Sequence, residues 1–214
     1  MEDFVQKVLP NILTAILCII LILRYKKLGP GLGYFLAAMI ISTVVNGAAF
    51  FYSLQQKGAS TAFLFVSGIL IAVYLCFFLY FRSLAKEKIY RNLHNIVLAL
   101  AVLTYIFSAV FIENFFTIFP SQTFFAISLL LLLSITIFII ETFNSDIILN
   151  ITNYFPIWAM TGILVVFIGI VPLMLITNVA DSIMNITTFR VMIAAINYVG
   201  YGILMFGTLY VKKV

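Results

Sequence analysis

Residues 128–158 read SLLLLLSITIFIIETFNSDIILNITNYFPIW. An apolar run ends at Glu141, and a short polar loop without Lys or Arg separates it from the next apolar run. Strands of membrane barrels alternate apolar and polar residues over about ten positions. Continuous apolar runs of about 20 residues are instead typical of helices that cross a bilayer. The stretch therefore predicts two membrane-spanning helices joined by an acidic loop.

The composition of the whole chain also indicates that the protein folds in a lipid bilayer. The 214 residues are 64% hydrophobic and 9% charged, with a mean hydropathy of +1.22, whereas a soluble domain has about 25% charged residues. In lipid every backbone N–H and C=O group needs an internal partner, which leaves helices or closed barrels. We therefore predict an all-α integral membrane protein whose main partner is the lipid bilayer. The basic residues lie between apolar runs, so we expect no binding to nucleic acid.

The apolar runs predict a seven-transmembrane-helix bundle that forms a single domain of residues 1–214. Short polar segments that contain Lys, Arg, Asn, Gly or Pro separate the runs. The expected spans are 5–24, 30–53, 60–82, 92–112, 121–144, 154–177 and 187–211. Pro172 falls late in the sixth span, where its missing N–H and its ring predict a kink.

The distribution of Lys and Arg predicts the orientation. With the N-terminus outside, nine basic residues fall on the inner side and three on the outer side, as the positive-inside rule requires for short loops. The inner residues are Arg24, Lys26, Lys27, Arg82, Lys86, Lys88, Arg91, Lys212 and Lys213, and the outer ones are Lys7, Lys57 and Arg190. We therefore expect the N-terminus out and the C-terminus in.

In this topology Glu141 lies at the inner membrane edge, close in depth to Arg82, and the loop that follows contains Asp146. Three interpretations of Glu141 remain open. The carboxylate reaches the interface alone, or pairs with Arg82 or Lys86, or has a coupling role, since carboxylates within membranes are often functional. Residues Glu141, Asp146, Arg82 and Lys86 are our candidates for coupling or for docking a cytoplasmic protein partner.

Polar and small residues recur at helical spacing on three spans, and such faces are expected to turn away from lipid. They are Ala38, Ser42, Asn46 and Ala49; His94, Ala101, Tyr105 and Ser108; and Arg190, Ala194, Asn197, Tyr201 and Thr208. One interpretation is an outward-opening cavity for a small apolar or amphipathic ligand. The candidate ligand-binding residues are Asn11, Asn46, Tyr105, Ser108, Asn197, Tyr201 and Arg190. The alternative is that these faces only form hydrogen bonds and close contacts between helices.

Catalytic and metal-binding patterns are missing from the sequence. One histidine, His94, and two cysteines, Cys18 and Cys76, lie far apart, so we expect no metal and no cofactor. We expect His94 to be half-solvated at the interface. The span interiors lack the clustered titratable groups that an intramembrane enzyme needs, so we do not expect an enzyme.

Two stretches carry a resemblance to a known class of protein. They are NYFPIWAMTGILVVFIG at residues 153–169 and INYVGYGILMFGTLYVKK at residues 196–213. Together with the predicted orientation, the chain resembles the compact seven-helix sensor regions associated with bacterial histidine kinases. The resemblance implies a module that passes ligand or membrane-state information inward. No kinase sequence follows Val214, so we expect the output to pass through a partner in trans.

These observations leave three functions open. The first is a sensor or receptor-like signal transduction module, in which rearrangement about Pro172 changes the inner loops. The second is an accessory or structural subunit of a membrane protein complex. The third is a small-solute transporter, which would need a continuous polar path that the span interiors supply poorly. We expect the protein in the inner (plasma) membrane of a bacterium.

Overall fold

The computed structural model describes residues 9–55, 60–179 and 186–211, and every regular element within these ranges is helical. The chain separates into two compact units. One consists of Pro30–Leu149, and the other of Met1–Gly29 together with Asn150–Val214. The two units are described separately below.

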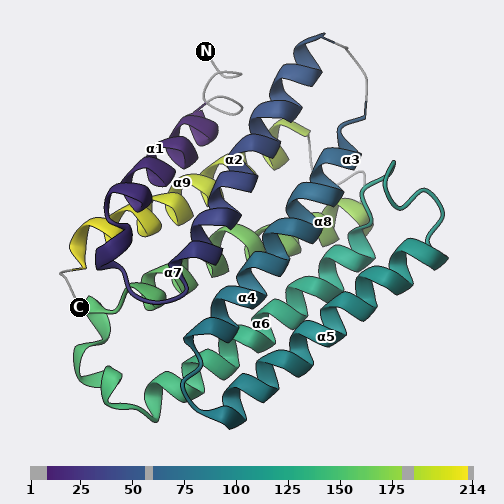
Figure 1. The fold of residues 1–214 in the computed structure, drawn as a ribbon. Helices are drawn as coiled ribbons and strands as arrows, with labels where there is room; N and C mark the ends of the chain where they lie inside the picture. The colour runs from purple at the N-terminus through teal and green to yellow at the C-terminus, as the bar shows by residue number, and fades with distance from the viewer. Residues whose placement is uncertain (1–8, 56–59, 180–185, 212–214) are drawn as a thin grey trace. The chain divides into compact units, whose positions relative to one another are not determined.

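The unit Pro30–Leu149 is a bundle of four helical rods (Figure 1). Its elements are α2 (Leu32–Gln55), α3 (Ala62–Leu64), a π-helical segment (Phe65–Val73), α4 (Tyr74–Leu84), α5 (Lys88–Phe111) and α6 (Ser121–Phe143). The elements α3, the π segment and α4 form one continuous rod. Only Ala85–Glu87 separate α4 from α5, so these two helices run antiparallel side by side. A 3₁₀ segment, Asp146–Asn153, leads into the other unit.

Helix α4 is the centre of this bundle because it packs against α2, α5 and α6. Its buried face is rich in aromatic residues, and their rings contact those of the neighbouring helices. The ring centroids of Phe35 and Tyr80 lie 5.4 Å apart, and those of Phe81 and Phe138 lie 5.6 Å apart. Tilted aromatic pairs at such distances stabilise packing beyond the area that they bury. Van der Waals contact of this kind holds helices together where lipid is as apolar as the core.

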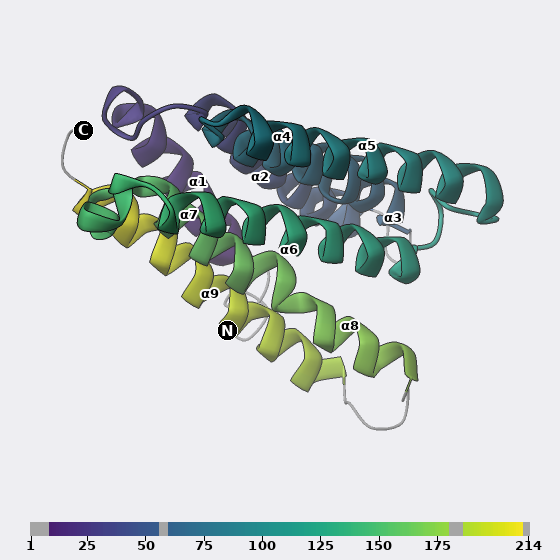
Figure 2. The same cartoon turned by 90° about the horizontal axis from the view of Figure 1, so that it is seen from below.

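The second unit contains α1 (Leu9–Leu23), α7 (Phe155–Ile163), a π-helical segment (Leu164–Ile168), α8 (Ile170–Val179) and α9 (Ile186–Tyr210). Helix α9 packs against α1 and α7, and Figure 2 shows α7, α8 and α9 as neighbours. Glycines allow the close approach of α7 and α9. A Cβ added to Gly162 would lie 2.3 Å from Cγ of Leu204, and one added to Gly207 would lie 2.2 Å from Cβ of Trp158. Small residues at helix interfaces serve this purpose in membrane proteins.

Six helical rods are long and apolar enough to cross a bilayer. They are Leu32–Tyr52, Ala62–Leu84, Lys88–Phe111, Ser121–Phe143, Phe155–Met174 and Val191–Tyr210. The prediction of an all-helical, multi-pass membrane protein is confirmed at this level. The described part of the first apolar helix, Leu9–Leu23, has 15 residues and is not among these six rods. The seven-span count and the orientation stay predictions. Lys7, Lys57, Lys212, Lys213 and the side chain of Arg190, which entered the count of basic residues, lie outside the described part.

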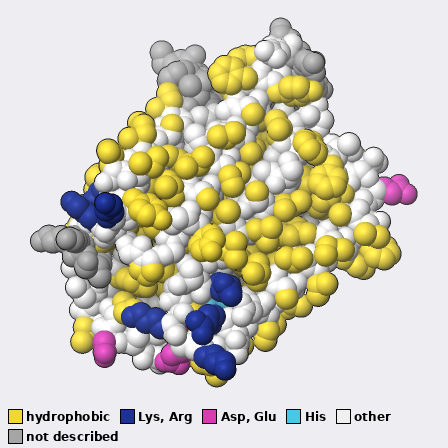
Figure 3. Space-filling view, in the orientation of Figure 1, with side chains coloured by type: hydrophobic (Ala, Val, Ile, Leu, Met, Phe, Trp, Pro, Cys, Tyr) yellow, Lys and Arg dark blue, Asp and Glu magenta, His cyan; other side chains and the backbone are white. Residues whose placement is uncertain are grey.

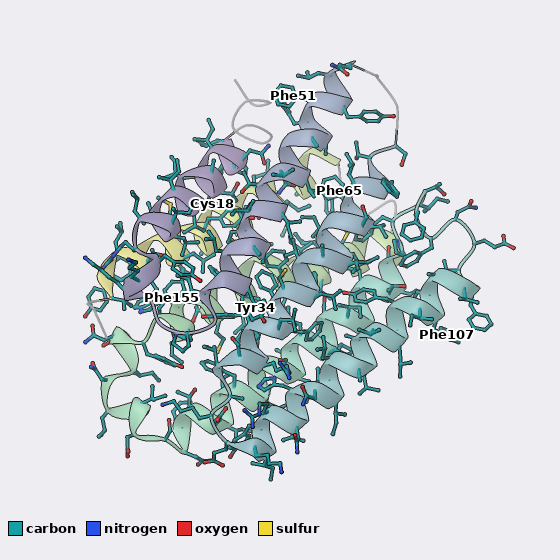
Figure 4. All side chains as sticks on the ribbon, viewed as in Figure 1. Cys18, Tyr34, Phe51, Phe65, Phe107 and Phe155 are labelled. Atoms are coloured by element: carbon teal, nitrogen blue, oxygen red, sulfur yellow. The ribbon has the colours of Figure 1, made fainter. Side chains whose placement is uncertain are left out.

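The outer faces of the helices carry large apolar side chains. Val44, Phe107 and Val110 are exposed, and Phe51 and Phe107 project away from their helices in Figure 4. Hydrophobic side chains also cover much of the face drawn in Figure 3. Such surfaces fit a hydrocarbon solvent, since soluble proteins rarely expose large contiguous apolar patches.

Candidate functional site

The carboxylate of Glu141 binds backbone groups rather than a basic side chain. Glu141 lies in the last turn of α6 and is 9% exposed. Its Oε1 atom accepts hydrogen bonds from the backbone N–H of Lys86 at 2.8 Å and of Glu87 at 3.1 Å. Glu87 is the N-cap residue of α5, where a negative charge interacts favourably with the helix dipole. Glu141 therefore fixes the connection between α4 and α5 to the end of α6.

Arg82, one of the two predicted partners of Glu141, binds Asn95 instead. Its Nε atom donates a hydrogen bond to Oδ1 of Asn95 on α5. The Arg82 side chain is half-buried, and the bond ties the end of α4 to the second turn of α5. Lys86 and Asp146, the other two candidates for docking, are exposed. The geometry brings Arg82, Lys86 and Glu141 to the same end of the bundle, whereas Asp146 lies beyond α6 on the 3₁₀ segment.

His94 is buried rather than half-solvated, which corrects the expectation from sequence. The residue is 2% exposed, and its Nδ1 atom lies 2.9 Å from the hydroxyl oxygen of Ser134 on α6. Its Nε2 atom is buried and has no hydrogen-bond partner in the described part of the chain. Helix α5 begins at Lys88, four residues before the predicted start, so His94 lies in its second turn and faces α6.

Tyr105 contacts the π segment of the neighbouring rod. Its hydroxyl group donates a hydrogen bond to the backbone C=O of Leu70, within Phe65–Val73. The same segment packs closely on α2, because a Cβ added to Gly68 would lie 2.2 Å from Cγ2 of Val45. The π-helical geometry forms i→i+5 backbone bonds and occurs frequently at functional sites. Just beyond the segment, the Tyr74 hydroxyl lies 2.9 Å from that of Ser128.

The other predicted cavity residues of this unit also have local partners. The Ser108 hydroxyl accepts a hydrogen bond from that of Thr123 at 2.8 Å, and both are buried. Asn46 is half-buried on α2, and its Nδ2 atom lies 3.4 Å from the Ser42 hydroxyl. At Tyr105 and Ser108 these contacts favour the interpretation of polar faces as hydrogen bonds between helices. A ligand cavity stays a prediction.

The remaining predicted cavity residues belong to the other unit. Tyr201 is buried on α9, and Asn197 is half-buried one turn before it. Asn11 lies in the first turn of α1, where its backbone C=O accepts a hydrogen bond from the Thr14 hydroxyl. The seven predicted residues are thus divided between the two units.

A contact that the sequence did not indicate involves Arg24. Its guanidinium group donates hydrogen bonds to the backbone C=O groups of Thr208, Leu209 and Val211, at 2.5 Å for Leu209 and 2.6 Å for Val211. Thr208 and Leu209 belong to the last turn of α9, where no following helical N–H groups remain to donate to the carbonyl groups, and Val211 directly follows the helix. Arg24 therefore caps α9, although more than 180 residues separate it from these partners in sequence.

No group of three or more His, Cys, Asp or Glu residues that could hold a metal ion lies within the described ranges. The comparison of this chain with protein families, with curated proteins and with solved structures gives no match. The resemblance to kinase-associated sensor regions therefore stays a prediction.

Proposed function

We propose that the chain is a non-enzymatic membrane sensor module that signals through a cytoplasmic protein partner in trans. The observation that carries this proposal is the π segment Phe65–Val73, which Tyr105 contacts at the Leu70 carbonyl. A helix can lose or gain such a widened stretch, and each residue of register turns the following helix by about 100° and moves it by about 1.5 Å. The segment is thus a candidate two-state element within a membrane span.

The packing offers a route from this element to the end of the bundle. The π segment continues into α4, and α4 ends at the short connection whose backbone N–H groups bind Glu141. A change of register in the π segment would rotate α4. The rotation would strain the hydrogen bonds between this connection and Glu141 of α6. The predicted orientation places that end in the cytoplasm, where a partner protein would detect the change.

A second widened segment lies beside Pro172 in the other unit. The backbone N–H of Gly169 donates to the C=O of Leu164 at 3.0 Å, an i→i+5 bond, three residues before Pro172. Proline lacks an N–H and crowds the preceding turn of a helix, which accounts for a break in the α-helical pattern there. This feature supports our proposal that rearrangement about Pro172 accompanies signalling.

The stimulus that we propose is a small apolar or amphipathic molecule bound near Asn46 and Tyr105 in one unit, or near Asn197 and Tyr201 in the other. Such a ligand acts only through a difference in its affinity for the two helix registers. A ligand that displaced the Tyr105 hydroxyl from the Leu70 carbonyl would favour the α-helical register. The lipid environment itself could have the same effect if it bound one register better.

Hydrogen exchange in nanodiscs tests the coupling. Tyr105→Phe removes the hydroxyl group and keeps the ring, so we expect faster exchange of the amides of Lys86 and Glu87, at the far end of α4. Tyr34→Phe is the matched control because Tyr34 is 43% exposed. A photo-crosslinker at the exposed position Ile89 then tests whether the yield of a protein partner changes in Tyr105→Phe. Equal exchange and equal crosslinking in both variants would refute the proposal.

A further inference from the structure

We infer that the end of the bundle formed by α4 and α5 binds the phosphate headgroup of an anionic phospholipid. The side chains concerned are those of Arg82, Lys86, Lys88 and Arg91, which we call the basic end. Figure 3 shows Lys and Arg side chains gathered over the ends of α4 and α5. Residues 82–91 contain these four cations and one acidic residue, Glu87.

Three of these side chains converge on one face. Lys88, Arg91 and Asn95 are three and four residues apart along α5, so they share a face of that helix. Arg82 reaches the same face from α4, because its Nε atom is bonded to Asn95. Tyr90 and His94 lie on a different face of α5, as their contacts with Asn144 and Ser134 of the α6 region show. The cations are therefore concentrated on the α4 side of α5.

The acidic residues nearby leave the basic end net positive, because the exposed Glu87 carboxylate offsets only one of its four cations. The Glu141 carboxylate is engaged by the backbone N–H groups of Lys86 and Glu87. The backbone N–H of Arg91 donates to the C=O of the N-cap residue Glu87 at 3.1 Å. The N–H groups before it in the first turn of α5 have no acceptor within the helix and point toward this end. Positive side chains beside a helix N-terminus suit an anion such as a phosphate group.

The depth of the basic end matches that of a lipid headgroup. Arg82 is two residues from the end of the candidate span Ala62–Leu84, and Lys88 is the first residue of the next. Lys88 and Arg91 are exposed, and exposed apolar residues such as Leu93 and Ile96 follow within two turns of α5, where an acyl chain would lie. Arg binds phosphate oxygens through paired N–H groups. In the proposed orientation this end meets the cytoplasmic leaflet, whose anionic lipids attract basic residues near the membrane.

Lipid titration of the purified full chain tests the inference. The chain in a neutral detergent is titrated with phosphatidylglycerol and with phosphatidylcholine of the same acyl chains, and bound lipid is counted by native mass spectrometry. We expect a clear preference for phosphatidylglycerol. Loss of affinity should be roughly fivefold for each cation removed in Lys88→Gln/Arg91→Gln and in Arg82→Gln. Inorganic phosphate at matched ionic strength should not displace the lipid.

The double variant Lys26→Gln/Lys27→Gln is the matched control, since it removes two exposed lysines from the other unit. It should bind phosphatidylglycerol within about twofold of the unmodified chain on the same titration, because the cations of the basic end are intact. If Lys88→Gln/Arg91→Gln does not fold, the single exposed variant Lys88→Gln carries the test. An equal loss in the control, an absence of lipid preference, or displacement by inorganic phosphate would overturn the inference. So would unchanged lipid binding accompanied by loss of a co-purifying protein, which would assign the face to a protein partner.

Discussion

The Oε1 atom of Glu141 lies 2.8 Å from the backbone nitrogen of Lys86, 55 residues away in sequence. A second backbone N–H, that of Glu87, binds the same oxygen. Hydrogen bonds to a charged group contribute about 1.5–3 kcal/mol, roughly twice the value for neutral groups. One carboxylate thus holds a helix connection that contains no regular structure of its own.

Substitution of Glu141 should separate the effect of charge from that of the acceptor. Glu141→Gln keeps an acceptor oxygen, so we expect a loss of about 1 kcal/mol in the free energy of unfolding. Glu141→Leu leaves two backbone N–H groups without a partner, so we expect a loss of about 2–4 kcal/mol. Denaturant unfolding in detergent measures both, with the exposed Asp146→Asn as control. Equal losses for Gln and Leu would contradict the role of the acceptor.

The buried pair of His94 and Ser134 gives a second prediction. In Ser134→Ala the Nδ1 atom of His94 loses its hydrogen bond to the Ser134 hydroxyl group on α6, which is 2.9 Å long. A buried polar atom left unsatisfied costs about 1–3 kcal/mol. Thr136→Ala on the same helix is the control, because Thr136 is exposed and bonds only within α6. Thermal unfolding should distinguish the two variants, and equal melting temperatures would argue against the pair.

Two glycines of α9 should respond in opposite directions to alanine. A Cβ on Gly200 would lie 2.2 Å from Cγ2 of Val166 and 3.3 Å from the Gly162 carbonyl oxygen, whereas one on Gly202 meets nothing within 4 Å. We expect Gly200→Ala to destabilise the fold by about 1–3 kcal/mol through overpacking. Gly202→Ala should stabilise it by up to about 1 kcal/mol through helix propensity. The difference between the two unfolding free energies tests the close packing of α9 on α7 and on the π-helical segment Leu164–Ile168. Similar values for the two variants would show that this packing is wrong.

Arg24 provides a test of the cap on α9. Arg24→Gln should cost about 1–2 kcal/mol, because the last carbonyl groups of α9 lose charged donors near the negative end of the helix dipole. Arg24→Lys should restore only part of this, since an ammonium group lacks the planar fork of a guanidinium. Hydrogen exchange of the last turn of α9 should rise in Arg24→Gln. The exposed Lys26→Gln controls for loss of charge, and the same rise there would refute the capping role.

The helical rods could be predicted from the sequence, because the length and apolarity of a run of residues indicate whether it can cross a membrane. The fifth predicted span, 121–144, is observed as Ser121–Phe143. The fourth was expected to begin at residue 92, but α5 begins at Lys88. Hydropathy detects the apolar part of a helix and misses a charged first turn such as that containing Lys88 and Arg91.

The partners of the polar residues were harder to predict. Arg82 and Glu141 could be placed at the same end of the bundle, yet one binds the amide of Asn95 and the other binds backbone N–H groups. Nearly every residue has a backbone N–H group, so the sequence does not show which of these groups binds a carboxylate. Searching for a basic partner therefore misses such a contact. The bonds of Arg24 to α9 depend on contacts between chain segments that local patterns do not encode.

The widened turns of Phe65–Val73 affect how the rod Ala62–Leu84 tolerates changes of length. A single residue removed from a regular helix turns everything beyond it by about 100° and breaks the interior face. A stretch that already holds surplus residues per turn can absorb such a deletion by tightening. In scanning mutagenesis across this rod, the positions that tolerate substitution should follow one helical periodicity before Val73 and a shifted one after it. A single helical wheel should therefore not describe both halves of the rod.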